Sequence, residues 1–100
     1  MNFEQRPEEI RKRFRARASS EAMQFEGDWK HYLDGSPAAA AAIRERAHAI
    51  AGTAATLQFD AIAEAAKNLE DAIGQTADAE RIRACIAVLM ACLRAVSTSE

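Results

Sequence analysis

Residues Ile43 to Ile73 read IRERAHAIAGTAATLQFDAIAEAAKNLEDAI, and this stretch decides the fold because it contains two apolar stripes. Each stripe has spacings of three and four residues, which place its members on one face of an α-helix. The first stripe consists of Ile43, Ala47, Ile50, Ala54 and Leu57, and the second of Ile62, Ala66, Leu69 and Ile73. The stretch therefore predicts two helices joined by a tight connection, with Asp60 capping the second helix and Gly74 ending it.

Two further helices flank this pair. The last carries a stripe made of Ile82, Ile86, Leu89, Leu93 and Val96. The first begins at Pro7, a residue that favours the first helical position, and continues to Leu33 with a kink or break at Gly27. Ser36 and Asp78 are expected to cap the second and fourth helices. The predicted helices span residues 7–33, 37–57, 60–73 and 78–96.

The short connections make consecutive helices antiparallel neighbours. The composition agrees, because the 100 residues include 24 alanines and only two prolines, a balance that favours helix over sheet. The sequence therefore predicts an all-α fold, an antiparallel four-helix bundle with up-down-up-down topology, in which residues 1–100 form one domain. Alanines in the stripes of the second and third helices predict that this pair approaches closely.

Composition also excludes several classes of protein. No apolar run approaches the roughly 20 residues of a membrane span, and the N-terminal segment MNFEQRPEEIRKRFR lacks the hydrophobic stretch of a secretory signal. We therefore expect a cytoplasmic protein without membrane association. Cys85 and Cys92 would lie roughly 10 Å apart on one helix, beyond disulfide reach, so they are predicted to be buried reduced thiols. No spacing of cysteine and histidine suggests a metal site.

The net charge of −2 hides an asymmetry. Residues 1–17 carry six basic and three acidic side chains, and the remainder carries seven and twelve. A basic helix can bind nucleic acid, but Ile10 and Phe14 are four residues apart, so the arginines read as the solvent-facing side of an amphipathic helix. Because the overall charge is negative and no aromatic platform accompanies the arginines, a nucleic-acid binder is the weakest alternative and no nucleic-acid partner is expected.

His48 points away from the apolar stripe of its own helix. At 100° per residue, its side chain lies about 140° from the centre of the stripe, on a face shared with Arg44, Gly52 and Ala55. A glycine inside a helix costs about 1 kcal/mol relative to alanine, so Gly52 suggests that another molecule approaches the imidazole. A surface histidine beside a tolerated glycine is the plain alternative. His31 lacks this setting.

The segment AHAIAGTAATLQFDAIAEAAKNLEDAI (residues 47–73) resembles the histidine phosphotransfer (HPt) domain family. The family hallmark is His-x-Leu-Lys-Gly, followed by small residues and Leu-Gly, and then by a helix with a Leu-Glu pair. The matching positions are His48, Ile50, Gly52, Ala54, Leu57, Phe59, Ile62, Leu69 and Glu70. The four-helix pattern extends the resemblance to nearly the whole chain.

The resemblance implies that His48 accepts a phosphoryl group from a receiver-domain aspartate or a kinase and passes it to another receiver aspartate. Glu70 matches a family position whose side chain hydrogen-bonds the imidazole. The implied partners are response-regulator receiver domains and a sensor or hybrid histidine kinase. Mg²⁺ would belong to the receiver, so no cofactor is expected in this chain. The chain would be a monomeric phosphoryl carrier without independent turnover, not an enzyme.

Two positions depart from the family pattern. The family lysine three residues after the histidine is Ala51, so Lys67 or Arg44 would have to supply positive charge near the phosphoryl group. The glycine of Leu-Gly is Gln58, which is expected to change the turn. Ala51, together with the neighbours Gly52 and Ala55, is expected to form the surface that docks a partner. The missing lysine favours the alternative of a degenerate adaptor that docks receiver or kinase domains without phosphotransfer.

Overall fold

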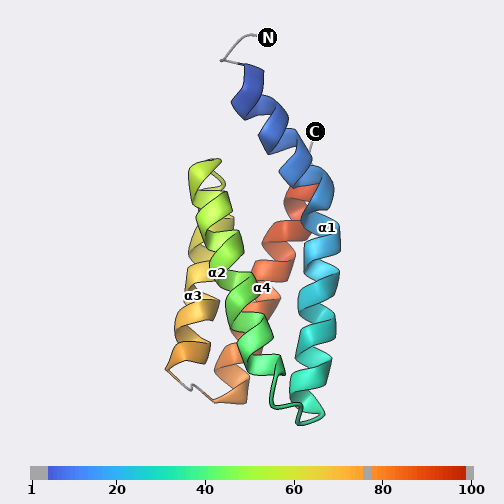
Figure 1. Ribbon diagram of the computed structural model, residues 1–100, viewed down its shortest axis with the longest axis vertical. Helices are drawn as coiled ribbons and strands as arrows, with labels where there is room; N and C mark the ends of the chain where they lie inside the picture. Colours follow the sequence, from blue (N-terminus) through green and yellow to red (C-terminus); the bar gives the residue numbers. More distant parts are fainter. Residues whose placement is uncertain (1–4, 76–77, 99–100) are drawn as a thin grey trace.

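Four helices form the part of the chain that the structure describes. A computed structural model describes residues 5–75 and 78–98. The helices are α1 (Gln5–Leu33), α2 (Ala39–Thr56), α3 (Asp60–Gly74) and α4 (Ala79–Ser97). They pack in a ring in which each helix contacts the next and α4 contacts α1 (Figure 1). The described residues contain no strand. The predicted antiparallel four-helix bundle is confirmed.

The core consists of the predicted stripes and one face of α1. Every member of the stripes of α2, α3 and α4 is buried except Val96, which is half-buried. The longest helix adds Phe14, Ala18, Ala22 and Phe25. The α2–α3 pair makes the most extensive contact of the four neighbouring pairs, as the alanines on both stripes predict. The site described below lies on this pair.

Two of the three predicted helix caps are wrong. The Ser36 hydroxyl does not cap α2, because residues 37 and 38 form a turn and the helix begins only at Ala39. Asp60 is the first residue of α3 and makes no capping hydrogen bond, although its carboxylate lies at the positive end of the helix dipole. Asp78 caps α4 as predicted, because its Oδ1 accepts a hydrogen bond from the Arg81 backbone N–H at 2.8 Å.

The first helix is continuous over 29 residues. It is already helical at Gln5, two residues before the predicted start at Pro7, and it passes through Gly27 without a break. Its N-terminal turns extend beyond the ends of the other helices (Figure 1). Ile10, predicted to share an apolar face with Phe14, is therefore 43% exposed, whereas Phe14 is buried.

Two N-terminal arginines of α1 are half-buried, and one of them, Arg11, joins α1 to the rest of the bundle. The Arg11 guanidinium lies 4.4 Å from the centre of the Phe59 ring and donates a hydrogen bond to the Leu57 carbonyl. Arg15 pairs with Glu8, with 3.4 Å between nitrogen and oxygen. Both arginines are half-buried, so the prediction of a solvent-facing side is wrong for them. Through Arg11, α1 contacts the connection between α2 and α3.

That connection contains a residue in the left-handed region. Gln58 has a φ of +65°, a conformation that favours glycine. Its N–H donates to the Ala55 carbonyl at 3.2 Å, and the Phe59 N–H donates to the Ala54 carbonyl at 2.8 Å. These two bonds are those of a Schellman motif. Gln58 therefore occupies the left-handed position of this turn, where glycine is the favoured residue.

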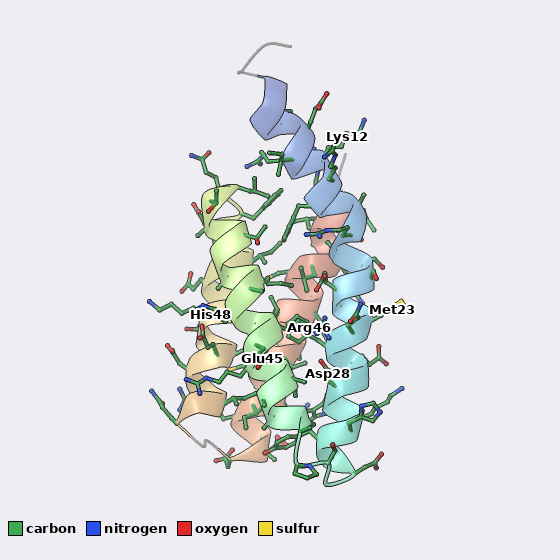
Figure 2. The ribbon with its side chains drawn as sticks, in the orientation of Figure 1. Lys12, Met23, Asp28, Glu45, Arg46 and His48 are labelled. Carbon is green, nitrogen blue, oxygen red and sulfur yellow. The ribbon has the colours of Figure 1, made fainter. Side chains whose placement is uncertain are left out.

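Ion pairs join α1 to one flank of α2. The Nε of Arg46 lies 3.1 Å from an Asp28 oxygen, and its Nη1 lies 3.8 Å from a Glu21 oxygen. Figure 2 shows Arg46 and Asp28 between the two helices, whereas His48 lies on the other flank of α2, beside α3. The two flanks of α2 therefore differ: one is held to α1 by ion pairs, and the other carries the histidine beside α3.

The two cysteines of α4 are free thiols. Both are half-buried against the core, less enclosed than predicted. None of the helices, over the residues that the structure describes, is long and apolar enough to cross a membrane.

Candidate functional site

His48 stands near the middle of α2 on its exposed face. Ala47 and Ile50 point into the core from the same turn, and this fixes the outward direction of the residue between them. The His48 side chain is 77% exposed. The exposure that the helical spacing predicts is therefore observed, and the imidazole is open to another molecule.

Glu70 of α3 contacts this imidazole. Its Oε2 lies 2.8 Å from the Nδ1 of His48, and its side chain is only 23% exposed. The neighbouring Leu69 is buried, and this places Glu70 at the edge of α3. A carboxylate can only accept a hydrogen bond, so Nδ1 donates and carries the ring proton. In the neutral imidazole with the proton on Nδ1, the other nitrogen, Nε2, has a free lone pair.

An open hollow of about 680 Å³ lies beside the histidine, between α2 and α3. Its polar lining comes from Arg44, Glu45, His48 and Glu70, and the rest of its lining is small or apolar. The hollow therefore combines a potential nucleophile, one cation and two carboxylates, and the rest of its lining is mostly alanine and glycine. Such an arrangement can admit a reacting group presented by another molecule.

Arg44 lies one helical turn before His48, and its guanidinium rests against Gly74 of α3. A Cβ added to Gly74 would lie 3.6 Å from Nη2 and 3.7 Å from Cζ of Arg44. Within the described residues, Arg44 makes no ion pair or side-chain hydrogen bond. The sequence predicted for Gly74 only a role in ending the third helix. Gly74 is the last residue of α3, but its φ is not positive, so the end of the helix does not require glycine. Its contact with Arg44 was missed because it joins two helices.

The other candidate cation is placed differently. Lys67 is exposed and lies one turn before Glu70 on α3, but it does not line the hollow. Ala51, at the position of the family lysine, is half-buried and packs against the core. Of the two cations named from the sequence, the structure brings Arg44 into the hollow with His48 and leaves Lys67 outside it.

The three residues predicted to dock a partner do not share one environment. Gly52 and Ala55 are exposed on the outer side of α2, whereas Ala51 is turned partly toward the core. A Cβ added to Gly52 would meet nothing within 4 Å, so internal packing does not require this glycine. Of the three residues predicted to dock a partner, Gly52 and Ala55 are therefore exposed, and Ala51 is half-buried.

The part of the chain that the structure describes contains no candidate metal site. No group of three or more histidine, cysteine or acidic side chains there is arranged to hold a metal ion.

Comparison with known proteins agrees with this geometry at the level of the family. Searches of curated proteins and of solved structures gave no match. A family model described as Hpt domain matches residues 9–99, which include all four helices apart from the first turn of α1. The chain therefore belongs to the Hpt domain family, whose members are phosphoryl carriers in phosphorelays and interact with receiver domains and kinases of two-component systems.

Proposed function

We propose that this protein is a phosphorelay intermediate in which His48 accepts a phosphoryl group from a receiver-domain aspartate, or from a kinase, and passes it to another receiver aspartate. The observation that carries the proposal is the hydrogen bond of 2.8 Å between Nδ1 of His48 and Glu70, on an imidazole that is exposed in a chain of the Hpt family. This bond selects the tautomer whose Nε2 is a nucleophile.

The transfer balances without removal of a proton. The Nε2 lone pair attacks phosphorus, and the bond between phosphorus and the aspartate oxygen breaks, so the receiver regains its carboxylate. The Nδ1 proton stays in place, and the imidazole ring acquires positive charge. The Glu70 carboxylate lies beside that charge and stabilises it. The reverse sequence of bond changes delivers the phosphoryl group to the next aspartate.

The partner supplies the rest of the chemistry in this proposal. Mg²⁺ and the groups that stabilise the transferring phosphoryl group belong to the receiver, so the chain needs no cofactor and has no independent turnover. Gly52 and Ala55 leave room for the receiver on the outer side of α2. We place the protein in the cytoplasm, where it acts as a monomer with receiver domains and a sensor or hybrid histidine kinase.

Incubation with a phosphorylated receiver domain tests the proposal. The chain should gain acid-labile, base-stable phosphate, and His48→Gln should abolish the labelling. His31→Gln is the matched control, because His31 is also exposed but lies at the end of α1 away from Glu70. Labelling that persists in His48→Gln and disappears in His31→Gln would contradict the assignment.

The second candidate function is an adaptor that docks receiver or kinase domains without phosphotransfer. Its supporting observation is Ala51, which removes a cation from the position where the family has lysine. The same experiment separates the two functions. An adaptor would bind the receiver with wild-type affinity in both histidine variants and would gain no phosphate.

A further inference from the structure

We propose that Arg44 binds the phosphoryl group on His48, and that Gly74 provides the space in which the guanidinium is held for this contact. The inference rests on the proposed function of His48 as phosphoacceptor. It assigns to Arg44 the charge that a lysine at position 51 would supply. It also gives Gly74 a role in the site rather than in the end of α3.

Arg44 is placed to reach a group attached to His48. The two residues are four apart on α2, so their side chains are neighbours on one helix face. Both line the hollow between α2 and α3. The planar guanidinium presents several N–H donors at once, an arrangement that suits the oxygens of a phosphoryl group.

The donors of Arg44 are free for such a contact. Arg46, two residues along the same helix, pairs with two carboxylates of α1. Arg44 has no such partner among the described residues. Two carboxylates share the hollow with it: Glu70 is bonded to the imidazole, and Glu45 lies beyond ion-pair distance. A phosphoryl dianion on His48 would therefore meet a guanidinium that no other anion occupies.

Gly74 explains how the guanidinium lies in the hollow. The Arg44 atoms Nε, Cζ and Nη2 lie 3.6 to 3.8 Å from the position of a Cβ at residue 74. These distances are ordinary van der Waals contact, so an alanine fits, but the outer atoms of a larger side chain would take the place of the guanidinium. The backbone does not require glycine here, because Gly74 has no positive φ.

The first experiment compares charge-removing variants by phosphorylation with phosphoramidate, a small phosphoryl donor that needs no docking surface. Arg44→Gln is compared with Lys67→Gln and with Arg83→Gln, which removes an exposed arginine of α4 that pairs with Glu80. Arg44→Gln should lower the steady-state occupancy of phosphate on His48 roughly two- to fivefold, the range for one exposed charge pair. The two control variants should match the wild type.

A second readout reports on the phosphoryl group itself. A ³¹P NMR titration of phosphorylated protein should show a higher phosphoryl pKa in Arg44→Gln, because the dianion loses a neighbouring positive charge. The phosphoryl pKa in Arg44→Lys should lie between those of the wild type and Arg44→Gln, since lysine keeps the charge but lacks the planar guanidinium. A purely structural role of Arg44 would leave this titration unchanged.

The Gly74 part is tested by a pair of variants. Gly74→Ala should retain wild-type occupancy, whereas Gly74→Leu should lower it to the level of Arg44→Gln. Gly74→Leu should have no further effect when Arg44 is already glutamine, because both changes then remove the same contact. Circular dichroism verifies that each variant keeps its helices.

Each outcome decides between the claims. Equal occupancy and equal titration in the wild type and Arg44→Gln would overturn the role of Arg44 and leave His48 as the phosphoacceptor. A lower phosphate occupancy in Lys67→Gln, with wild-type occupancy in Arg44→Gln, would overturn the role of Arg44 and assign it to Lys67. A wild-type protein that gains phosphate on His48 from neither phosphoramidate nor a phosphorylated receiver would overturn the proposed function itself.

Discussion

The two nitrogens of the His48 ring have different surroundings. Nδ1 is 2.8 Å from the Glu70 carboxylate, and the rest of the ring is on the exposed side of α2. The carboxylate is mostly covered by its own helix pair, so its oxygen stays directed at the ring instead of rotating into water. In the proposed transfer, Glu70 thus orients the imidazole and offsets its developing charge without touching the phosphoryl group.

Glu70→Ala should slow phosphotransfer to His48 roughly two- to tenfold, the range for loss of a hydrogen bond worth about 0.5–1.5 kcal/mol. Binding of the receiver should not change, because the outer face of α2 is intact. Rapid-quench labelling measures the rate, and calorimetry measures the binding. Glu70→Gln keeps an acceptor oxygen and should lose less. A transfer rate in Glu70→Ala equal to that of the wild type would refute the orienting role.

Ala51→Lys should restore phosphorylation in an Arg44→Gln background. Because Ala51 is half-buried, the lysine stem would run along α2 and bring its ammonium group out near His48. In the wild-type background the gain should be small, since Arg44 already supplies a cation. A double-mutant cycle of acid-labile phosphate at fixed receiver concentration measures the coupling. Strictly additive effects would show that the two cations do not substitute for one another.

At the scale of the helices, the apolar stripes were sufficient to predict the core, because the spacing of three and four follows from helix geometry alone. Helix starts were harder to predict. Ser36 has the right side chain for a cap, but its backbone carbonyl accepts from the Ala39 N–H in a separate turn, and α2 starts later. The outcome depends on the conformation of residues 37 and 38, which residue preference alone does not determine.

The candidate site was predictable to the extent that each residue follows from its own helix. The exposure of His48 follows from its angle on α2, and Glu70 follows from the family motif. The contact of Arg44 with Gly74 depends on how far two helices lie apart, and a stripe does not encode that distance. For the same reason the sequence named both Lys67 and Arg44 as the compensating cation, although of these two only Arg44 lines the hollow.

Gln58→Gly should stabilise the protein by about 1 kcal/mol, because a left-handed residue with a side chain costs roughly 1–2 kcal/mol and the entropy of an added glycine offsets part of the gain. Urea unfolding measures the change. Gly35→Ala is the matched opposite, since Gly35 has a φ of +86° at the end of α1 and should lose a similar amount. If Gln58→Gly lowered the midpoint of unfolding, the left-handed turn would be refuted.

At the scale of the whole molecule, one pair of helices carries the candidate site and the other pair supports it. The α2–α3 pair carries the imidazole, the carboxylate and the guanidinium, and α1 and α4 close the ring behind it. Ion pairs fix α2 to α1 on one flank, and Arg11 holds the α2–α3 connection at its end. The site is therefore supported from behind and from one end, while its outer face is exposed.

Gly52→Gln should weaken receiver binding while making the helix more stable. The new side chain meets no atoms of the chain within 4 Å of its Cβ, and glutamine has a higher helix propensity than glycine by roughly 0.5–1 kcal/mol. The side chain would, however, fill the space one turn from His48. Ala91→Gln, on the exposed side of α4, is the control for an added side chain elsewhere. Unchanged affinity in Gly52→Gln would show that docking does not use this face.

The bare outer side of α2 has a consequence for the direction of signalling. In the proposed phosphorelay, Gly52 and Ala55 offer few side-chain atoms that could distinguish one receiver domain from another, so a donor and an acceptor would dock on the same surface and react at the same nitrogen. A carrier that binds both receivers in the same way does not itself set the direction of phosphoryl transfer. The net direction of transfer would then depend on the ratio of phosphorylated to unphosphorylated aspartate in each of the two receivers. It would reverse when the difference between these ratios reverses.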